Sequence, residues 1–183
     1  MFDACSQYIN VDVVCCQNVV ISETEDTNLW EPFNNDIKVL SGKDAIVKLF
    51  SDDLESLNPF WCKLIRKKVL FDFDYIKYKS DFPLCYFEDG FVIPLLYMRA
   101  DNILMLSNKL YAYRIVNNSL SHSTLNTKYF INQVRTTLVL YDVLGKYDYG
   151  VQKKCYEGLM LGIMKSYYCS LKEGSIRNHR AVS

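Results

Sequence analysis

The sequence predicts an α+β fold, with N-terminal strands and a hairpin followed by a helical C-terminal third. Two observations indicate this class. In the first half, runs of β-branched and aromatic residues alternate with period two, as they do in strands. In the last third, apolar residues recur every three or four positions, as on one face of a helix. The alternative is a mostly α-helical bundle, which applies if residues 94–116 form a single helix.

The chain length of 183 residues suits one domain. We predict a single globular domain over residues 1–174, followed by a flexible basic tail over residues 175–183, because these last residues are polar. Half of the residues are apolar and 14% are aromatic, which argues against an intrinsically disordered chain. No internal repeat or low-complexity tract divides the sequence.

The first elements are expected to be a strand, a loop and a helix. Val and Ile dominate Ile9–Ile21, which predicts one or two strands. The acidic stretch 22–36 contains a proline and is expected to form a loop. Apolar residues at helical spacing predict a helix over Lys43–Leu57, with Ser41 as its N-cap and Asn58-Pro59 as its end.

The middle of the chain is predicted to be mostly β-structure. Alternating aromatic residues indicate a strand over Val69–Ile76. Residues 84–93 are expected to form a β-hairpin, because Asp89-Gly90 suits a tight turn. For residues 94–116 we favour a helix that starts at Pro94, because Pro is common at the first helical position, and then a strand over Lys109–Val116.

Two helices joined by a short loop are predicted in the C-terminal third. The first covers Thr127–Leu144 and ends near Gly145, and the second covers Tyr149–Leu171. Each helix carries an apolar stripe that is expected to face the core: Phe130, Val134, Leu138 and Tyr141 on the first, and Val151, Cys155, Leu159 and Ile163 on the second.

The charge is segregated along the chain although the formal net charge is zero. Residues 21–57 hold nine acidic and three basic residues, whereas residues 63–80 hold six basic and two acidic ones. The last segment, 146–183, is also basic. The neutral total argues against a protein that binds nucleic acid through a uniformly basic surface, but it leaves local basic sites open.

The seven cysteines are expected to be free thiols in a reducing compartment. Their number is odd, and Asp3, Ser6 and Gln7 interrupt the first residues, which therefore do not show the pattern of a signal peptide. No apolar run is long enough to predict membrane insertion. No Cys-x-x-Cys pair and no Gly-rich phosphate loop occurs, so we predict no metal and no cofactor. A catalytic thiol would need a nearby base. His122 could serve Cys155 or Cys85 in this way, but the spacing of these residues in the sequence does not predict it.

One segment combines basic and aromatic residues, as single-stranded nucleic-acid sites do. Basic groups neutralise phosphates, and aromatic rings stack on unpaired bases. The predicted nucleic-acid-binding residues are Trp61, Lys63, Arg66, Lys67, Lys68, Lys77 and Lys79.

A second candidate site lies on the last helix, where small residues recur at every fourth position. Such residues let another backbone approach closely, and tyrosine is enriched in interfaces. We therefore predict an oligomer interface that contains Gly158, Gly162, Ser166 and Tyr167.

The sequence predicts a non-catalytic, self-associating interaction protein that acts inside a cell, in the cytoplasm. Its abundance of Asn, Lys, Tyr and Ile is typical of A/T-rich genomes, so we expect a viral protein that acts on host partners in the host cytoplasm. The expected partners are a second copy of the chain and an unidentified protein. The alternative is an RNA- or DNA-binding protein, and the second alternative is an enzyme with a thiol site.

Overall fold

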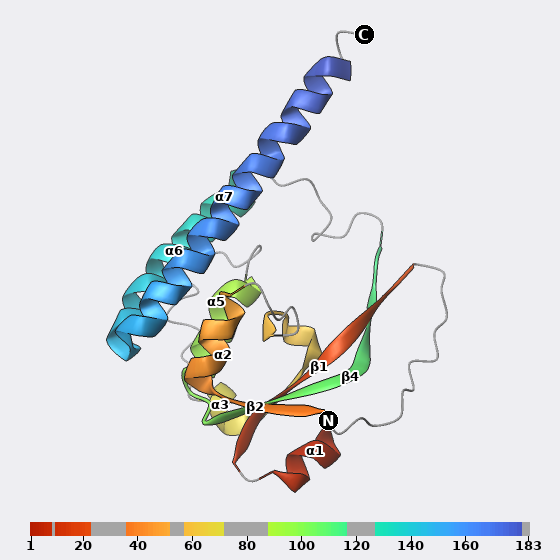
Figure 1. The fold of residues 1–183 in the computed structure, drawn as a ribbon, viewed down its shortest axis with the longest axis vertical. Helices are drawn as coiled ribbons and strands as arrows, with labels where there is room; N and C mark the ends of the chain where they lie inside the picture. Colours follow the sequence, from red (N-terminus) through yellow and green to blue (C-terminus); the bar gives the residue numbers. More distant parts are fainter. Residues whose placement is uncertain (9, 23–35, 52–56, 72–87, 117–126, 181–183) are drawn as a thin grey trace.

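A mixed four-stranded sheet with helices packed on it confirms the predicted α+β class (Figure 1). The structure is a computed structural model that describes residues 1–8, 10–22, 36–51, 57–71, 88–116 and 127–180. The sheet order is β2-β4-β1-β3, with a parallel central pair, β1–β4, and antiparallel outer pairs. The strands are β1 (Val11–Ile21), β2 (Ile37–Ser41), β3 (Lys63–Ile65) and β4 (Asn102–Arg114).

Helices cover both faces of this sheet. On one face, α1 (Phe2–Gln7) closes a small apolar cluster. The other face belongs to a larger core that α2 (Gly42–Leu49), α3 (Lys67–Phe71) and α5 (Glu88–Tyr97) help to build. A hairpin of two long helices, α6 (Thr127–Tyr147) and α7 (Tyr149–Arg180), packs on the outer side of α2 and α5 (Figure 1).

Strand β1 is apolar at consecutive positions because both of its faces are buried. Val13 and Cys15 face the larger core, whereas Val14 and Cys16 face the smaller cluster under α1. Because both faces are covered, residues 11–16 are all buried. The strand predicted over Ile9–Ile21 is therefore confirmed over Val11–Ile21, and the side chains of Cys15 and Cys16 diverge as a strand requires.

Helix α2 has the predicted N-cap but ends earlier than predicted. The Ser41 hydroxyl accepts a hydrogen bond from the backbone amide of Asp44 at 3.0 Å. The helix ends at Leu49 instead of Leu57, because Ser51 closes the last turn. The Ser51 hydroxyl donates to the carbonyl of Val47 at 2.8 Å, and its amide bonds the carbonyl three residues back.

The hairpin predicted over residues 84–93 is wrong from residue 88 onward, where helix α5 begins. Asp89-Gly90 stands in the first turn of this helix, and Pro94 lies inside it instead of at its start. Residues 91–97 are buried on every side of the helix, so no periodicity marks it as helical. The strand predicted to begin at Lys109 begins at Asn102, and its buried residues 103–106 lie in the centre of the sheet.

The strand predicted over Val69–Ile76 is also wrong in its described part. Residues 67–71 form α3, and residues 72–76 lie outside the described residues. The short strand β3 ends at Ile65, and the amide of Arg66 then bonds the carbonyl of Asp12 at 2.8 Å. The chain turns there, which places the side chain of Val69 in the larger core.

The predicted C-terminal helical hairpin is confirmed, but two details differ. Gly145 does not end α6, which continues to Tyr147, and α7 continues past Leu171 to Arg180. The backbone at 175–180 is therefore helical, and the flexibility of the predicted basic tail stays a prediction. The stripe predicted on α7 is buried as expected. Of the stripe predicted on α6, Leu138 is 61% exposed and Tyr141 is also exposed, while Leu140 and Leu144 face the core instead. The side chain of Phe130 is not among those described.

Asp148 connects the hairpin to the rest of the fold. Its Oδ1 accepts a hydrogen bond from the amide of Val151 at 2.9 Å, in the first turn of α7. Its Oδ2 lies 2.6 Å from the Lys43 ammonium of α2. This bond from Lys43, together with the amide bonds, lowers the pKa of the Asp148 carboxyl.

This pair predicts a pH-dependent contribution to stability. A carboxyl whose pKa is lowered on folding stabilises the protein above its unfolded pKa, and this contribution is lost as the pH falls through the folded pKa. Asp148→Asn keeps an N-cap but loses the ion pair, so the variant should be less stable than wild type at pH 7. The difference should shrink below a pH of roughly 4.

Urea unfolding of both proteins at neutral and acidic pH measures this difference. Asp142→Asn, at an exposed position on α6, serves as the control and should lack the effect. A difference in unfolding free energy that is the same at pH 3 as at pH 7 would contradict the prediction.

Candidate functional site

The predicted nucleic-acid-binding residues lie on three short, consecutive elements. Trp61 belongs to the 3-10 helix η2 (Phe60–Cys62), Lys63 opens β3, and Lys67 and Lys68 begin α3. Arg66 lies between β3 and α3 and is exposed, as are both of these lysines. Lys77 and Lys79 lie outside the described residues.

A buried carboxylate engages two of these basic residues. Asp12 is 1% exposed, and its Oδ1 lies 3.0 Å from the ammonium of Lys68 and 3.7 Å from Nε of Arg66. Its Oδ2 accepts a hydrogen bond from the amide of Asp101 at 2.8 Å. Asp12 raises the pKa of Lys68, chiefly through the hydrogen bond between their side chains. The positive charge of Arg66 and Lys68 is thus partly compensated inside the protein.

Trp61 stacks on two tyrosines of β4 that sequence reasoning did not assign to the site. Its ring centroid lies 4.5 Å from that of Tyr111 and 5.1 Å from that of Tyr113, with interplanar angles of 26° and 27°. The tyrosines alternate along the strand, which was a detectable signal. Lys63 is anchored locally, because its ammonium donates to the carbonyl of Pro59.

Four of the five described cysteine thiols are buried, and burial disfavours their thiolate form. Burial raises the pKa of Cys155 to about 12 and that of Cys16 to about 11. Burial also raises the pKa of Cys15 and of Cys62. A thiol reacts as its thiolate, so these four thiols react slowly while they remain buried. His122 and Cys85 lie outside the described residues.

No group of three or more His, Cys, Asp or Glu side chains within the described ranges is placed to hold a metal ion. The helices of the same ranges also include none that is long and apolar enough for a bilayer crossing.

The glycines of the predicted oligomer interface contact other parts of the same chain. A Cβ added to Gly158 would lie 2.3 Å from the carbonyl oxygen of Phe50, at the end of α2. A Cβ added to Gly162 would lie 3.4 Å from the amide of Gln133 on α6. The close approach that these small residues allow is thus used for packing α7 in its own chain. The side chain of Ser166 is not among those described, and Tyr167 is exposed.

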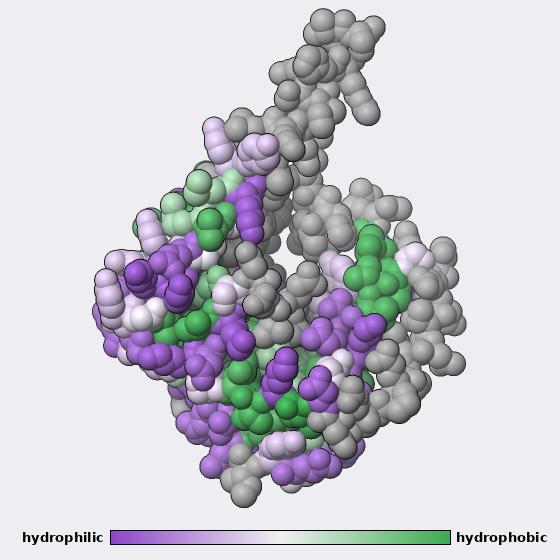
Figure 2. Space-filling view, viewed as in Figure 1, coloured by the Kyte–Doolittle hydropathy of each residue, from purple (hydrophilic) through white to green (hydrophobic). Residues whose placement is uncertain are grey.

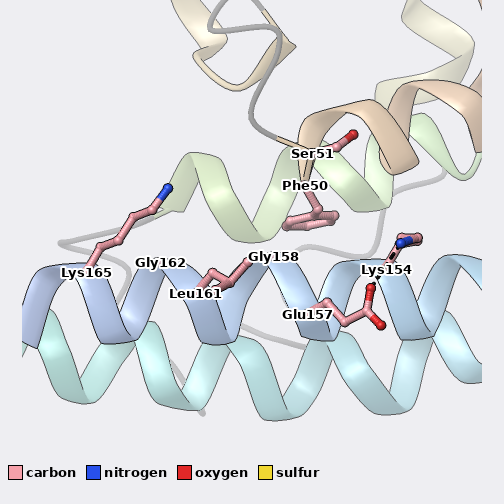
Figure 3. Close-up of a pocket in the computed structure, with 8 residues that line it drawn as sticks. All are labelled: Phe50, Ser51, Lys154, Glu157, Gly158, Leu161, Gly162 and Lys165. Atoms are coloured by element: carbon pink, nitrogen blue, oxygen red, sulfur yellow. Dashed lines mark hydrogen bonds and ion pairs between the residues drawn. The ribbon is translucent and has the colours of Figure 1, made fainter.

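A cleft of about 430 Å³ opens where the end of α2 meets α7 (Figure 3). Phe50 extends toward α7, and Leu161 borders the opening (Figure 3). Lys154 and Glu157 form an ion pair of 3.1 Å at one end of the cleft. Its other lining residues are Ser51, Gly158, Gly162 and Lys165.

Two exposed apolar side chains of the hairpin, Leu138 and Tyr141, belong to the α6 stripe that was predicted to face the core. Tyr141 of α6 meets Tyr156 of α7 edge to face, at 5.4 Å between ring centroids, so the exposed stripes of both helices join there. We name this surface the hairpin face; it comprises Ile131, Leu138, Tyr141, Tyr156, Met164 and Tyr167, all more than 40% exposed. Figure 2 shows hydrophobic residues on the hairpin among charged ones, and a second hydrophobic patch at the outer ends of β1 and β4.

No family model matches the sequence, and no curated protein matches it either. The function must therefore be inferred from the surfaces described above.

Proposed function

We propose that this protein is a non-catalytic interaction protein that associates with a second copy of itself through the hairpin face. The observation that carries the proposal is the exposure of Leu138 and Tyr141 on the apolar stripe of α6. Leu138 and Met164 are 61% and 63% exposed, although the described part of each helix also has a buried face. Large apolar side chains that gather on one surface are typical of protein interfaces.

The composition of the hairpin face also supports an interface between proteins. Tyrosine and methionine are enriched in the cores of interfaces, where lysine and glutamate are depleted. The hairpin face contains three tyrosines, a methionine, a leucine and an isoleucine. Tyr156 and Tyr167 are about three helical turns apart, so they project from the same side of α7.

The unequal lengths of the two helices favour a second copy as the partner. Helix α7 has 32 residues and α6 has 21. The C-terminal part of α7 therefore extends past the start of α6, and it is drawn without a neighbouring helix among the described elements (Figure 1). Isolated helices are marginally stable in water. A second hairpin, related by two-fold symmetry, would flank this part of α7 and give a four-helix layer.

An intracellular setting forms part of the proposal. The described cysteines, Cys5, Cys15, Cys16, Cys62 and Cys155, are free thiols, which suits a reducing compartment. The nucleic-acid alternative is less favoured, because Asp12 compensates two of the basic residues on which that alternative depends. Its remaining support is the stacked group around Trp61.

The proposal predicts that a charge on the hairpin face dissociates the oligomer. Leu138→Glu and Met164→Glu change exposed residues, so both variants should fold. Each should convert a dimer into a monomer at protein concentrations of roughly 10–100 µM, because an unpaired carboxylate would be buried in the interface. Sedimentation equilibrium or light scattering after size exclusion measures the mass.

Leu161→Glu is the matched control, because Leu161 is 53% exposed on the same helix but borders the cleft. If this variant alone loses the dimer, the interface lies at the cleft and not on the hairpin face. If the wild type is a monomer, self-association is refuted. The same measurement with a single-stranded oligonucleotide tests the alternative. A salt-sensitive complex that Lys67→Glu weakens would replace the proposed function by nucleic-acid binding.

A further inference from the structure

Two cysteines lie close together where the 3-10 helix η2 leads into β3. The antiparallel β1–β3 ladder ends with Cys15 opposite Lys63; Cys16 follows on β1, and Cys62, the last residue of η2, precedes Lys63. The Sγ of Cys16 lies 3.6 Å from the carbonyl oxygen of Cys62. Both side chains belong to the small cluster under α1, so they lie on the same face of the sheet. Paired residues in an antiparallel ladder have Cα atoms roughly 4.5–5.5 Å apart, so the two cysteines next to the last pair start close to the range that a disulfide spans.

We propose that Cys16 of β1 and Cys62 of η2 are a neighbouring dithiol that a peroxide converts into a disulfide. This modification site is independent of the hairpin face and of the proposed function. It would fasten η2 and β3, and with them Trp61, to the central strand β1.

The reaction is balanced with hydrogen peroxide as the oxidant. The Cys62 thiolate attacks one peroxide oxygen; the O–O bond breaks, and Cys62 becomes a sulfenic acid while hydroxide leaves. The Cys16 thiolate then attacks the Cys62 sulfur; the S–S bond forms, the S–O bond breaks, and a second hydroxide leaves. Both hydroxides take up the protons released by the thiols. Two thiols are oxidised and one peroxide is reduced to two waters.

The surroundings favour Cys62 as the first thiol to react. The Lys63 ammonium lies 3.8 Å from its Sγ. The pKa of Cys62 is raised by burial, and Lys63 and the backbone amide of Cys16 offset part of this rise. Access requires that the segment opens, and β3 is suited to this because it is a three-residue strand at the edge of the sheet.

The other described cysteines are less suited to pair with Cys62. Cys15 faces the larger core, where its Sγ lies 3.5 Å from the hydroxyl of Tyr97. Cys155 belongs to that same core. Cys5 contacts the small cluster from α1 and is the remaining competitor.

The test treats the folded, full-length chain with hydrogen peroxide, blocks the remaining thiols, and maps linked peptides by mass spectrometry without reduction. We expect a loss of two hydrogen atoms and a cross-link between the peptides that contain Cys16 and Cys62. Fragmentation between Cys15 and Cys16 in the wild-type peptide identifies the linked residue without any variant. The melting temperature should rise by roughly 10 °C and return on reduction, because the bond closes a long loop.

Matched variants separate the possible partners. The cross-link should persist in Cys15→Ala and Cys5→Ala and disappear in Cys16→Ala. A cross-link at Cys5 or Cys15 in wild type, or oxidation to sulfinic acids without a cross-link, would overturn the proposal.

Discussion

Gly42→Ala is expected to destabilise the protein by about 3 kcal/mol or more, although alanine is the better helix former. Gly42 is the first residue of α2 and packs against the end of α5. An added Cβ would lie 2.1 Å from the carbonyl oxygen of Tyr97 and 2.5 Å from that of Ala100. Backbone atoms cannot rotate away as a side chain can, so α2 and α5 would have to separate. Side chains of the larger core that α2 and α5 contribute would then lose contact with one another.

The measurement is the free energy of unfolding in urea, with helix content followed by circular dichroism. Gly162→Ala is the control, because its added Cβ would make only an ordinary contact of 3.4 Å. This control should be neutral or stabilise α7 by up to about 1 kcal/mol. A Gly42→Ala variant as stable as the control would show that α2 moves freely against α5, contrary to the packing described.

Asp12→Ala is expected to have the second largest effect, a loss of about 2–3 kcal/mol. The carboxylate of Asp12 joins three elements, because it contacts Lys68 of α3, Arg66 after β3, and the amide of Asp101 before β4. The two cations are exposed and can return to water. The loss therefore comes from the weakened link to these cations and from the Asp101 amide, which is left without its acceptor.

Asp12→Asn separates these contributions, since the amide oxygen can still accept from Asp101 while the charge is gone. We expect an intermediate stability for this variant in the same urea experiment. Asp101→Ala is the control for the outer ion pair with Lys68, which is 3.6 Å long and exposed, and it should change stability by less than about 1 kcal/mol. Equal stability of Asp12→Ala and wild type would disprove the role of the buried carboxylate.

The elements that could be predicted are those with a local physical signal. Ser41 with Asp44 marks a helix start, and the apolar run at 11–16 marks a strand covered on both faces. Helix α5 could not be predicted, because its residues 91–97 are buried on all sides and therefore lack a period. Asp89-Gly90 suits both a tight turn and a helical first turn, and only tertiary packing decides between them.

The candidate surfaces were predictable only in part, because partners distant in sequence decide them. The apolar stripe at Leu138 and Tyr141 is visible in the sequence, but its outward position depends on where α6 meets the core. The basic residues Arg66 and Lys68 are also visible in the sequence. Their partner Asp12 is not, because it lies more than 50 positions away in an apolar strand where the sequence gives no sign of a binding role. Cys16 and Cys62 lie close together because of the register in which β3 pairs with β1, and the sequence alone does not determine this register.

The parallel pairing of β1 with β4 has a consequence for synthesis on the ribosome. The two central strands are separated by most of the N-terminal two thirds of the chain, as the Asp101–Asp12 contact across 89 positions illustrates. Contacts between distant segments form slowly, because the closing of a long loop precedes the gain from pairing. While the chain is being synthesised, β1 remains unpaired with β4, and its apolar side chains stay exposed until β4 has emerged. Helices α6 and α7 are adjacent in sequence and can pack together soon after both have emerged. A nascent chain paused before residue 102 should therefore be a preferred client of chaperones.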